Sequence, residues 1–293
     1  MKASIVIRTY NEARHLPDLL RGISHQQMDH LEKEVIVVDS GSTDRTLEIA
    51  HAFGCRVEHI PKARFSFGGS LNVGCGAATG DALVIISGHC IPASKHWLNR
   101  LVEPLRQKQV VWTYGRQIGN GLSRFSERRI FEKYFPSESR VPQEGFFCNN
   151  ANSAILAEVW RAHPFDEKLT GLEDMHLAKK LVSLGMDIGY VAEAPVYHIH
   201  EETWSNVKNR FEREAIALQF IMPEVQVTFW DFMRYLSSSL LFDYAAALRE
   251  KVFVRNVLDI FKYRLVQYWG TYRGNHFHRQ LSRQQKERYF YPR

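Results

Sequence analysis

Short apolar runs and helically spaced apolar positions alternate along the first hundred residues. Three segments are short and rich in apolar, β-branched residues, as buried strands are: residues 3–9, 34–39 and 82–87. Residues 56–60 are predicted as a further strand. Apolar positions at helical spacing lie between them, over residues 17–24, 47–53 and 71–79. This alternation predicts an α/β fold in which a mostly parallel sheet is covered by helices on both faces.

The pattern changes twice after residue 110. From residue 112 to residue 147 the periodicity weakens, which predicts a loop-rich region. A helix over residues 174–184 and a strand over residues 188–191 are predicted next. Beyond Trp204 the sequence is typical of helices with broad apolar faces.

The predicted domain boundary coincides with a change in charge. We predict one domain over residues 1–204, with halves at 1–110 and 111–204, and a basic helical tail over 205–293. Residues 1–204 carry 23 Lys and Arg against 24 Asp and Glu, whereas residues 205–293 carry 15 against 8. The net charge of +6 therefore comes from the tail, which indicates an anionic partner such as a membrane surface or nucleic acid.

Basic and apolar residues are interleaved in the tail between Arg249 and Leu265. A basic amphipathic helix of this kind suits docking on an anionic membrane surface. Two alternatives remain: a helical hairpin whose charges are merely solvated, and a contact between two copies in a homodimer. No motif of a nucleic-acid-binding fold occurs, so we predict no nucleic-acid partner.

Two further features bear on the cellular compartment. The apolar run at residues 4–7 is too short for a signal peptide, and no window reaches the roughly 18 apolar residues of a membrane span. The four cysteines lack the spacing of a disulfide framework or a zinc site. We therefore predict a cytoplasmic protein, either free or bound peripherally at the inner face of the cell membrane.

Polar residues follow three of the predicted strands. Ligands of open parallel sheets bind beyond the carboxyl ends of the strands, which places residues 9–12, 39–44 and 87–90 on one rim. A carboxylate at Asp39 can hydrogen-bond a ribose or a base edge there, and a helix cap is the alternative. The sequence has neither a GxGxxG fingerprint nor a P-loop, which argues against a dinucleotide site and against a P-loop NTPase.

Three motifs, in this order, resemble the family-2 glycosyltransferases, which are inverting enzymes with the GT-A fold: residues 4–12 (SIVIRTYNE), 37–44 (VVDSGSTD) and 80–86 (GDALVII). The resemblance continues through residues 149–154, 164–167, 173–174 and 196–200. It covers residues 1–204 and implies a GT-A fold with a mostly parallel nucleotide-binding sheet flanked by helices, followed by a C-terminal helical extension.

The resemblance implies a site for a nucleotide-diphosphate sugar. Residues at the first two strand ends are implied to hold the base and ribose: Thr9, Tyr10, Glu12 and Asp39. A later stretch is implied to close over the nucleotide and donor: Lys62, Phe67 and Asn72. Ser87 and Gly88 complete the implied nucleotide site. For Lys62 a solvated loop lysine is the alternative, and Asn72 alternatively caps or packs a helix.

The implied metal site departs from the family pattern. Ser87-Gly88-His89 stands where the family carries an Asp-x-Asp that binds Mg²⁺ or Mn²⁺ and stabilises the diphosphate leaving group. Three alternatives remain open: a metal held by His89 with a late histidine, a metal held mainly by diphosphate and water, or no metal. We favour the first, with His198 as partner and His200 as the alternative, because His198 follows a predicted strand. Two packing histidines are the competing interpretation.

Glu173-Asp174 is the implied catalytic pair. Inverting transfer needs a base that takes the proton of the acceptor hydroxyl, and a carboxylate suits this role. The resemblance assigns the base to Asp174, with Glu173 beside it to orient the acceptor. The alternative is a pair of acidic residues that stabilise the start of a helix.

The predicted function is transfer of a sugar, UDP- or dTDP-linked, to a glycan or lipid-linked acceptor in the synthesis of a bacterial surface polysaccharide. Residues 114–117 (YGRQ) resemble a segment of rhamnosyltransferases in this family, which hints at a dTDP-rhamnose donor. The alternative is a non-catalytic relative that binds nucleotide or glycan and has lost the Asp-x-Asp metal site.

Overall fold

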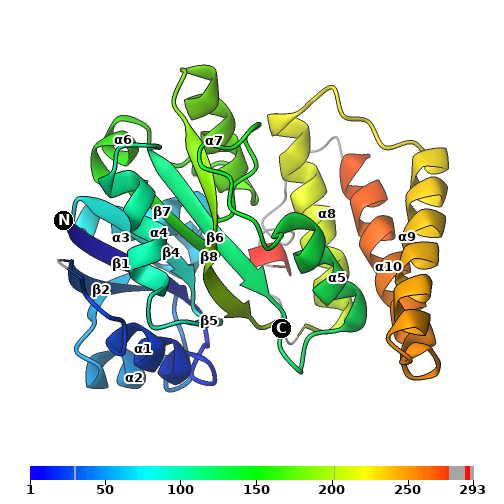
Figure 1. Cartoon of the computed structure of the whole chain (residues 1–293), viewed down its shortest axis with the longest axis horizontal. Helices are drawn as coiled ribbons and strands as arrows, with labels where there is room; N and C mark the ends of the chain where they lie inside the picture. The colour runs from blue at the N-terminus through cyan, green and yellow to red at the C-terminus, as the bar shows by residue number, and fades with distance from the viewer. Residues whose placement is uncertain (30, 201, 277–287, 291–293) are drawn as a thin grey trace. The chain divides into compact units, whose positions relative to one another are not determined.

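The computed structural model describes residues 1–29, 31–200, 202–276 and 288–290, and it divides into two compact units (Figure 1). Unit 1 comprises residues 1–120, 134–169 and 173–199. Unit 2 comprises residues 121–133, 170–172 and those from 200 onwards. Of the predicted tail, residues 277–287 and 291–293 lie outside the described residues.

Unit 1 is built on one sheet, which has eight strands among the described residues, in the order β3-β2-β1-β4-β7-β6-β8-β5. Their bounds are β1 Lys2–Thr9, β2 Glu32–Asp39, β3 Arg56–His59, β4 Ala82–Ser87, β5 Cys90–Pro92, β6 Trp112–Ile118, β7 Asn152–Leu156 and β8 Ile188–His198. The first four lie side by side in parallel, as the apolar runs predict.

The other half of the sheet is mixed. β7 runs antiparallel to both β4 and β6, and β5 runs antiparallel to β8, whereas β6 and β8 are parallel. The α/β class is therefore confirmed, with the parallel arrangement concentrated in the half that precedes residue 90. β5 and β7 are not among the predicted strands, because β5 has only three residues and buried polar residues such as Asn152 interrupt the apolar pattern of β7.

Helices cover both faces of the parallel half. α1 (Leu16–Ser24) and α4 (Trp97–Arg106) share one hydrophobic core with the alternate β1 residues Ala3, Ile5 and Ile7. α3 (Phe67–Ala77) packs on the opposite face, where Gly74 comes so close to the sheet that an added Cβ would lie 2.4 Å from Val6. The apolar residues on both sides of β1 follow from this burial.

The remaining elements of unit 1 complete the layers. They are α2 Thr46–Ala52, the 3₁₀ turn η1 Lys62–Arg64, α6 Ala157–Ala162 and α7 Glu173–Ser183. The predicted loop-rich region over residues 112–147 is wrong at two places, since β6 and α5 (Phe125–Tyr134) lie within it. Buried polar residues such as Thr113 and Gln117 interrupt the apolar pattern of β6 and explain the error.

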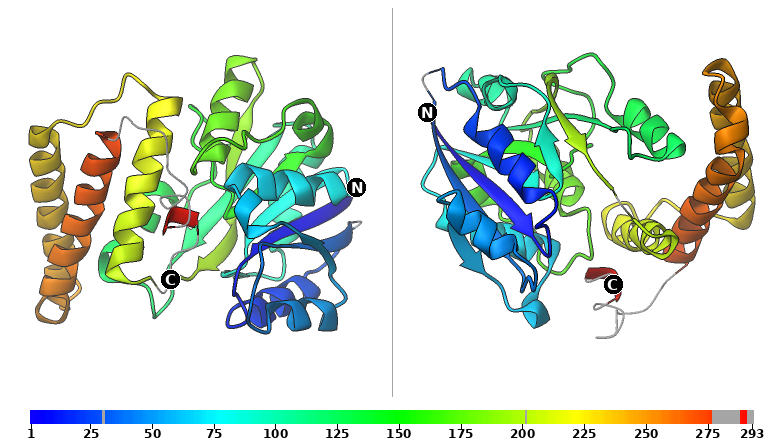
Figure 2. Two further views of the ribbon diagram at one scale, coloured as in Figure 1. Left: turned by 180° about the vertical axis from the view of Figure 1, so that it is seen from behind. Right: turned by 90° about the horizontal axis from the view of Figure 1, so that it is seen from below.

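Unit 2 contains the long helices α8 (Trp204–Ile221), α9 (Phe229–Arg249) and α10 (Phe253–Asn275). α10 lies between the other two, as both views in Figure 2 show. A buried ion pair links α10 to α9, because the Arg264 guanidinium donates to both carboxylate oxygens of Asp243, at 2.7 and 2.9 Å. No helix among the described residues has the length and hydropathy that a bilayer crossing requires.

Candidate active site

The parallel strands bring several predicted site residues to one edge of the sheet. Thr9 at the end of β1 is in register with Asp39 at the end of β2. Arg8 is in register with Ser87 at the end of β4. The carboxyl ends of these strands thus form the rim that the sequence predicts, and the segments after them carry Tyr10, Glu12 and His89.

Asp39 is buried and organises the turn that follows β2. Its Oδ2 accepts hydrogen bonds from the backbone N–H groups of Gly41 and Ser42, both at 2.9 Å. Its Oδ1 accepts from the hydroxyls of Ser42 and Thr9. A ribose hydroxyl that binds Asp39 must share or replace one of these contacts, because a carboxylate has about four acceptor sites.

Tyr10 and Lys62 lie together beside this rim. The Lys62 ammonium donates to the Tyr10 hydroxyl at 3.1 Å and lies 5.2 Å from the ring centroid. Phe67 begins α3 and contacts Arg8, whose guanidinium lies 5.0 Å from the ring centroid. Aromatic rings and two cations thus lie near the strand ends.

Both the nitrogen and the oxygen of the Asn72 side-chain amide form hydrogen bonds with other residues of the protein. Its Nδ2 donates to the Phe165 carbonyl and to Glu167, each at 2.9 Å. Its Oδ1 accepts from the Phe165 N–H and the Trp160 indole. These four hydrogen bonds join α3 to the segment that follows α6, which is the packing alternative considered for Asn72.

His89 contacts Glu12, which the sequence resemblance assigns to the nucleotide. The Nδ1 atom of His89 lies 2.9 Å from Glu12 Oε1. The intervening residue of the Ser-Gly-His segment must be small: a Cβ on Gly88 would meet Glu12 Cγ at 2.9 Å. The glycine therefore permits the close approach of the two segments.

His198 lies next to His89. Cys90 pairs with His198 across the antiparallel strands β5 and β8, so the two imidazoles meet at the strand end. Their rings are stacked with centroids 5.1 Å apart, at an interplanar angle of 17°. Ring nitrogens of the two side chains lie within 4.8 Å of one another. The predicted pair is thus close enough to share one metal ion.

His200, the alternative ligand, belongs to unit 2. Its Nδ1 lies 2.7 Å from Glu127 Oε1, and Glu202 is near enough for the three to surround an ion. The Arg210 guanidinium already pairs with both carboxylates, at 3.4 and 2.8 Å. A cation therefore neutralises this cluster, and we assign no metal to it.

Asp174 is buried at the start of α7 and is held by two backbone N–H groups. Its Oδ2 accepts from Asn150 and its Oδ1 from Met175, both at 2.8 Å. Burial, and after it the neighbouring Glu173 carboxylate, raises the pKa of Asp174 to about 7, against the effect of these N–H groups and the charge of Arg8. The buried carboxyl of Asp174 is thus easier to protonate than that of an exposed aspartate.

Three residues around the rim have no predicted role from sequence. The Arg8 guanidinium forms an ion pair with Glu173 at 3.3 Å. Among the described residues, the buried Nδ2 of Asn150 has no hydrogen-bond partner, although the Asn150 backbone holds Asp174. Gln117 is buried and its Oε1 lies 2.6 Å from His198 Nδ1. Arg8 is a charge inside an apolar strand, a signal that could have identified it. Asn150 and Gln117 lie in segments that the resemblance covers, 149–154 and 114–117, but the resemblance assigns neither residue a role.

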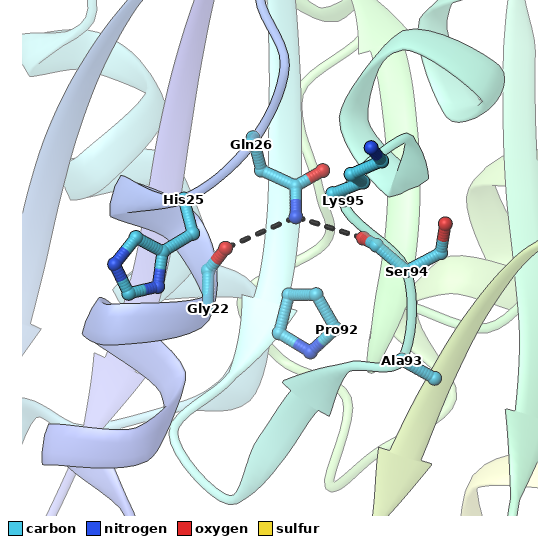
Figure 3. Close-up of a pocket in the computed structure, with 7 residues that line it drawn as sticks. All are labelled: Gly22, His25, Gln26, Pro92, Ala93, Ser94 and Lys95. Atoms are coloured by element: carbon cyan, nitrogen blue, oxygen red, sulfur yellow. Dashed lines mark hydrogen bonds between the residues drawn. The ribbon is translucent and has the colours of Figure 1, made fainter.

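A small pocket of ≈ 160 Å³ lies elsewhere in unit 1, between α1 and the segment after β5 (Figure 3). Its lining residues are Gly22, His25, Gln26, Pro92, Ala93, Ser94 and Lys95, none of which is a predicted site residue. The Gln26 amide donates to the carbonyls of Gly22 and Ser94, at 3.0 and 2.9 Å (Figure 3). These bonds join the two segments, and we assign the pocket no role in the chemistry.

The chain belongs to glycosyl transferase family 2. The sequence model of that family matches residues 4–159, more than half of the chain. Two O-antigen chain rhamnosyltransferases are similar to it: RfbN of Salmonella typhimurium and WbaN of Salmonella anatum. They are 26% and 28% identical over 216 and 189 residues. The matches cover 69% and 61% of this chain, and 68% and 60% of the relatives.

The fold also resembles solved structures. The mannosyltransferase PcManGT from Pyrobaculum calidifontis, solved with GDP-Man and Mn²⁺, matches with a TM-score of 0.61 and 17% identity over 99% of this chain and 87% of its own. At this identity the likeness concerns the fold alone. Together with the family match it confirms the GT-A-type fold that the motifs imply.

Proposed function

We propose that the chain transfers a sugar from a UDP- or dTDP-linked donor to a glycan or lipid-linked acceptor, with inversion at the anomeric carbon. The observation that carries this proposal is Asp174, a buried carboxylate at the strand rim whose pKa is raised to about 7. The membership of glycosyl transferase family 2 supplies the reaction class. The similarity to two O-antigen rhamnosyltransferases supports polysaccharide synthesis and favours testing a dTDP-rhamnose donor first.

Asp174 acts as the general base in this proposal. The acceptor hydroxyl attacks the anomeric carbon, its proton passes to the Asp174 carboxylate, and the C–O bond to the nucleoside diphosphate breaks with both electrons leaving on the phosphate oxygen. A base with a pKa near the working pH combines a large ionised fraction with a strong tendency to take the proton. The two N–H groups on Asp174 fix the direction of its oxygens.

Glu173 and Asn150 position groups around the base. The ion pair with Arg8 holds Glu173 beside Asp174, and the Glu173 charge raises the pKa of Asp174. The buried Nδ2 of Asn150 lacks a protein partner among the described residues, and a substrate hydroxyl would satisfy it. We therefore assign Asn150 to substrate binding.

Thr9, Tyr10, Glu12 and Asp39 hold the base and ribose in our proposal, with Lys62, Phe67, Ser87 and Gly88 near the diphosphate. The rim position of Thr9, Asp39 and Ser87 supports this assignment. Asn72 supports the site indirectly, since its four hydrogen bonds are made to protein.

In our proposal His89 and His198 would hold a divalent cation. Two stacked imidazoles with ring nitrogens within 4.8 Å are a nitrogen donor set, which points to a first-row transition ion rather than to the oxygen-preferring Mg²⁺; Mn²⁺ is the weakest binder among those ions. When bound, such an ion neutralises charge on the diphosphate leaving group. His89 and His198 would hold it, and Glu12 orients His89 through the bond to Nδ1.

Donor hydrolysis and transfer measured with Asp174→Asn test the proposal. We expect binding of the nucleotide to stay within a few-fold of wild type while transfer is lost. An NMR spectrum of the product should show the anomeric configuration opposite to that of the donor. Loss of nucleotide binding in the variant would assign Asp174 a structural role. Absence of both hydrolysis and transfer in the wild type, with nucleotide still bound, would favour the non-catalytic alternative.

The α9–α10 hairpin offers a surface for the proposed membrane partner. The hairpin tip, residues 241–262, is the lower end of both helices in Figure 1. It exposes apolar side chains, among them Phe242 at 72% and Val254 at 89%. The same stretch carries four exposed basic residues, Arg249, Lys251, Arg255 and Lys262, against one exposed acidic residue, Glu250. Apolar side chains within a basic surface fit an anionic bilayer, and we propose that the tip docks the enzyme there.

Vesicle co-sedimentation tests this docking. Wild type should bind vesicles that contain phosphatidylglycerol and not pure phosphatidylcholine, and added salt should weaken the binding. Phe242→Ser with Val254→Ser should abolish binding, whereas Leu184→Ser, an exposed leucine in unit 1, should leave it unchanged. A dimer that forms through the tip in solution, with no vesicle binding, would contradict the proposal.

A further inference from the structure

Three hydrogen bonds connect the backbone of Ala151 to the ring of His198. The Ala151 N–H donates to Asn149 Oδ1 at 3.0 Å. The same oxygen accepts from Gln117 Nε2 at 2.8 Å. The other end of the Gln117 amide, Oε1, lies 2.6 Å from His198 Nδ1. All four residues belong to unit 1.

The direction of this chain follows from its first member. A backbone N–H only donates, so the Asn149 atom facing it must be the amide oxygen. The Gln117 group that meets this oxygen must then be the NH₂ group, which leaves the Gln117 oxygen facing His198. An amide oxygen only accepts, so a proton of His198 lies on Nδ1, and in the neutral ring the lone pair lies on Nε2.

His89 reaches the same state by a different route. Its Nδ1 faces the Glu12 carboxylate, which accepts a hydrogen bond when ionised. The two stacked rings therefore carry their lone pairs on the same kind of nitrogen. Histidines that ligate metals commonly donate their other N–H to a carboxylate or an amide oxygen, which fixes the tautomer before the metal binds.

We propose that Gln117 is a positioning residue that fixes His198 in the Nδ1–H tautomer and thereby presents Nε2 to a divalent cation. This inference rests on the proposed metal site at His89 and His198. It gives a role to one residue of the 114–117 segment, which the sequence resemblance connected only with the donor sugar. Gln117 is 2% exposed, so its amide is committed to Asn149 and His198 rather than to solvent.

Two substitutions of similar length separate this role from packing. Gln117→Glu keeps an acceptor opposite His198 but introduces a buried charge next to the Asn149 oxygen. Gln117→Met keeps the length and apolar contacts but removes the acceptor. Burying a charge costs more than burying a thioether, so Gln117→Glu should be the less stable variant in either case. If Gln117 only fills space, Gln117→Met should keep the Mn²⁺ affinity of the wild type. If Gln117 orients His198, Gln117→Met should bind Mn²⁺ more weakly than Gln117→Glu.

The experiment has two measurements on the full chain. Long-range ¹H–¹⁵N correlation spectra of the metal-free protein report the histidine tautomer, and electron paramagnetic resonance titration reports Mn²⁺ affinity in the presence of the nucleotide. We expect the Nδ1–H tautomer in wild type and in Gln117→Glu, and a mixture in Gln117→Met. We expect Mn²⁺ affinity to fall by about 10- to 100-fold in Gln117→Met and by less than that in Gln117→Glu.

Asn149→Leu is a second route to the same result. It leaves Gln117 in place but removes the oxygen that orients the Gln117 amide, so it should also give mixed tautomers. An Nε2–H tautomer in the wild type, or Mn²⁺ affinity unchanged in a folded Gln117→Met variant, would overturn the proposal. A wild type with the Nδ1–H tautomer that binds no Mn²⁺ would refute the metal site and this role of Gln117, while leaving the hydrogen-bond assignment intact.

Discussion

Replacement of Asp174 by asparagine should change the pH dependence of stability as well as abolish transfer. Burial and Glu173 raise the pKa of Asp174 from 3.8 to about 7. Between these values the folded state holds a proton that the unfolded state has lost. Stability of the wild type is therefore highest below the unfolded pKa and is lost as the pH rises through the folded pKa. The variant has no carboxyl group to titrate at this position.

The magnitude follows from the same shift. Each pH unit between the two pKa values changes the free energy of unfolding by about 1.36 kcal/mol. Raising the pH from about 5 to about 8 should therefore lower the free energy of unfolding of the wild type by about 3 kcal/mol through the titration of Asp174. In the variant, the amide has one acceptor oxygen for the two backbone N–H groups that donate to Asp174 in the wild type. Because one N–H group loses its acceptor, the free energy of unfolding of the variant should be lower by about 1–3 kcal/mol at every pH. The variant should be the less stable form at pH 5 and should match or exceed the wild type at pH 8.

Urea unfolding of both proteins at a series of pH values measures the difference. Titrating groups remote from Asp174 occur in both chains and largely cancel in the comparison, whereas Glu173 interacts with Asp174 and contributes to the measured difference. The expected result is a difference in unfolding free energy that moves in favour of Asp174→Asn by about 3 kcal/mol between pH 5 and pH 8. A constant difference across this range would show that the Asp174 pKa lies near its ordinary value, and it would remove the main support for Asp174 as a base tuned to neutral pH.

Three further changes have defined outcomes. His89→Ala should lower activity and remove any Mn²⁺ dependence; an unchanged metal response in a titration of activity would exclude His89 as a ligand. Asn150→Ala should slow transfer without moving the pH–rate profile, because the backbone N–H of residue 150 still donates to Asp174. A shifted profile would mean that the Asn150 side chain changes the pKa of Asp174 instead. Gly74→Ala should destabilise the fold by about 1–3 kcal/mol because its Cβ would meet two valine side chains at 2.4 and 2.6 Å. Gly121→Ala, with open space around its Cβ position, is the matched control in thermal unfolding.

The central strands of the parallel half could be predicted from sequence because burial on both faces leaves a continuous apolar run in each of them. β1 and β4 show this most clearly, and their observed ends at Thr9 and Ser87 agree with the predicted ones. β6 and β7 could not be predicted so simply. They carry buried polar residues such as Thr113 and Asn152, whose partners come from distant parts of the chain.

The residues of the candidate site also differ in how far the sequence predicts them. Motifs located the rim, the Glu173-Asp174 pair and the histidines, since each follows a strand or begins a helix. The contacts of Arg8, Gln117 and Asn150 depend on which strands become neighbours. The partner of Arg8, for example, is Glu173, 165 residues away in sequence. Such pairings become visible only when the sheet order is known.

The central claim, a transferase that holds a nucleotide-diphosphate sugar with the help of a metal, is tested most directly by calorimetric binding of UDP, dTDP, GDP and CDP. Each nucleotide is titrated with Mn²⁺ and again with EDTA. We predict that UDP or dTDP binds tightly with Mn²⁺ and that EDTA removes most of this affinity. Equal binding in EDTA would contradict the metal site, and no binding of any of the four nucleotides would contradict the transferase proposal itself.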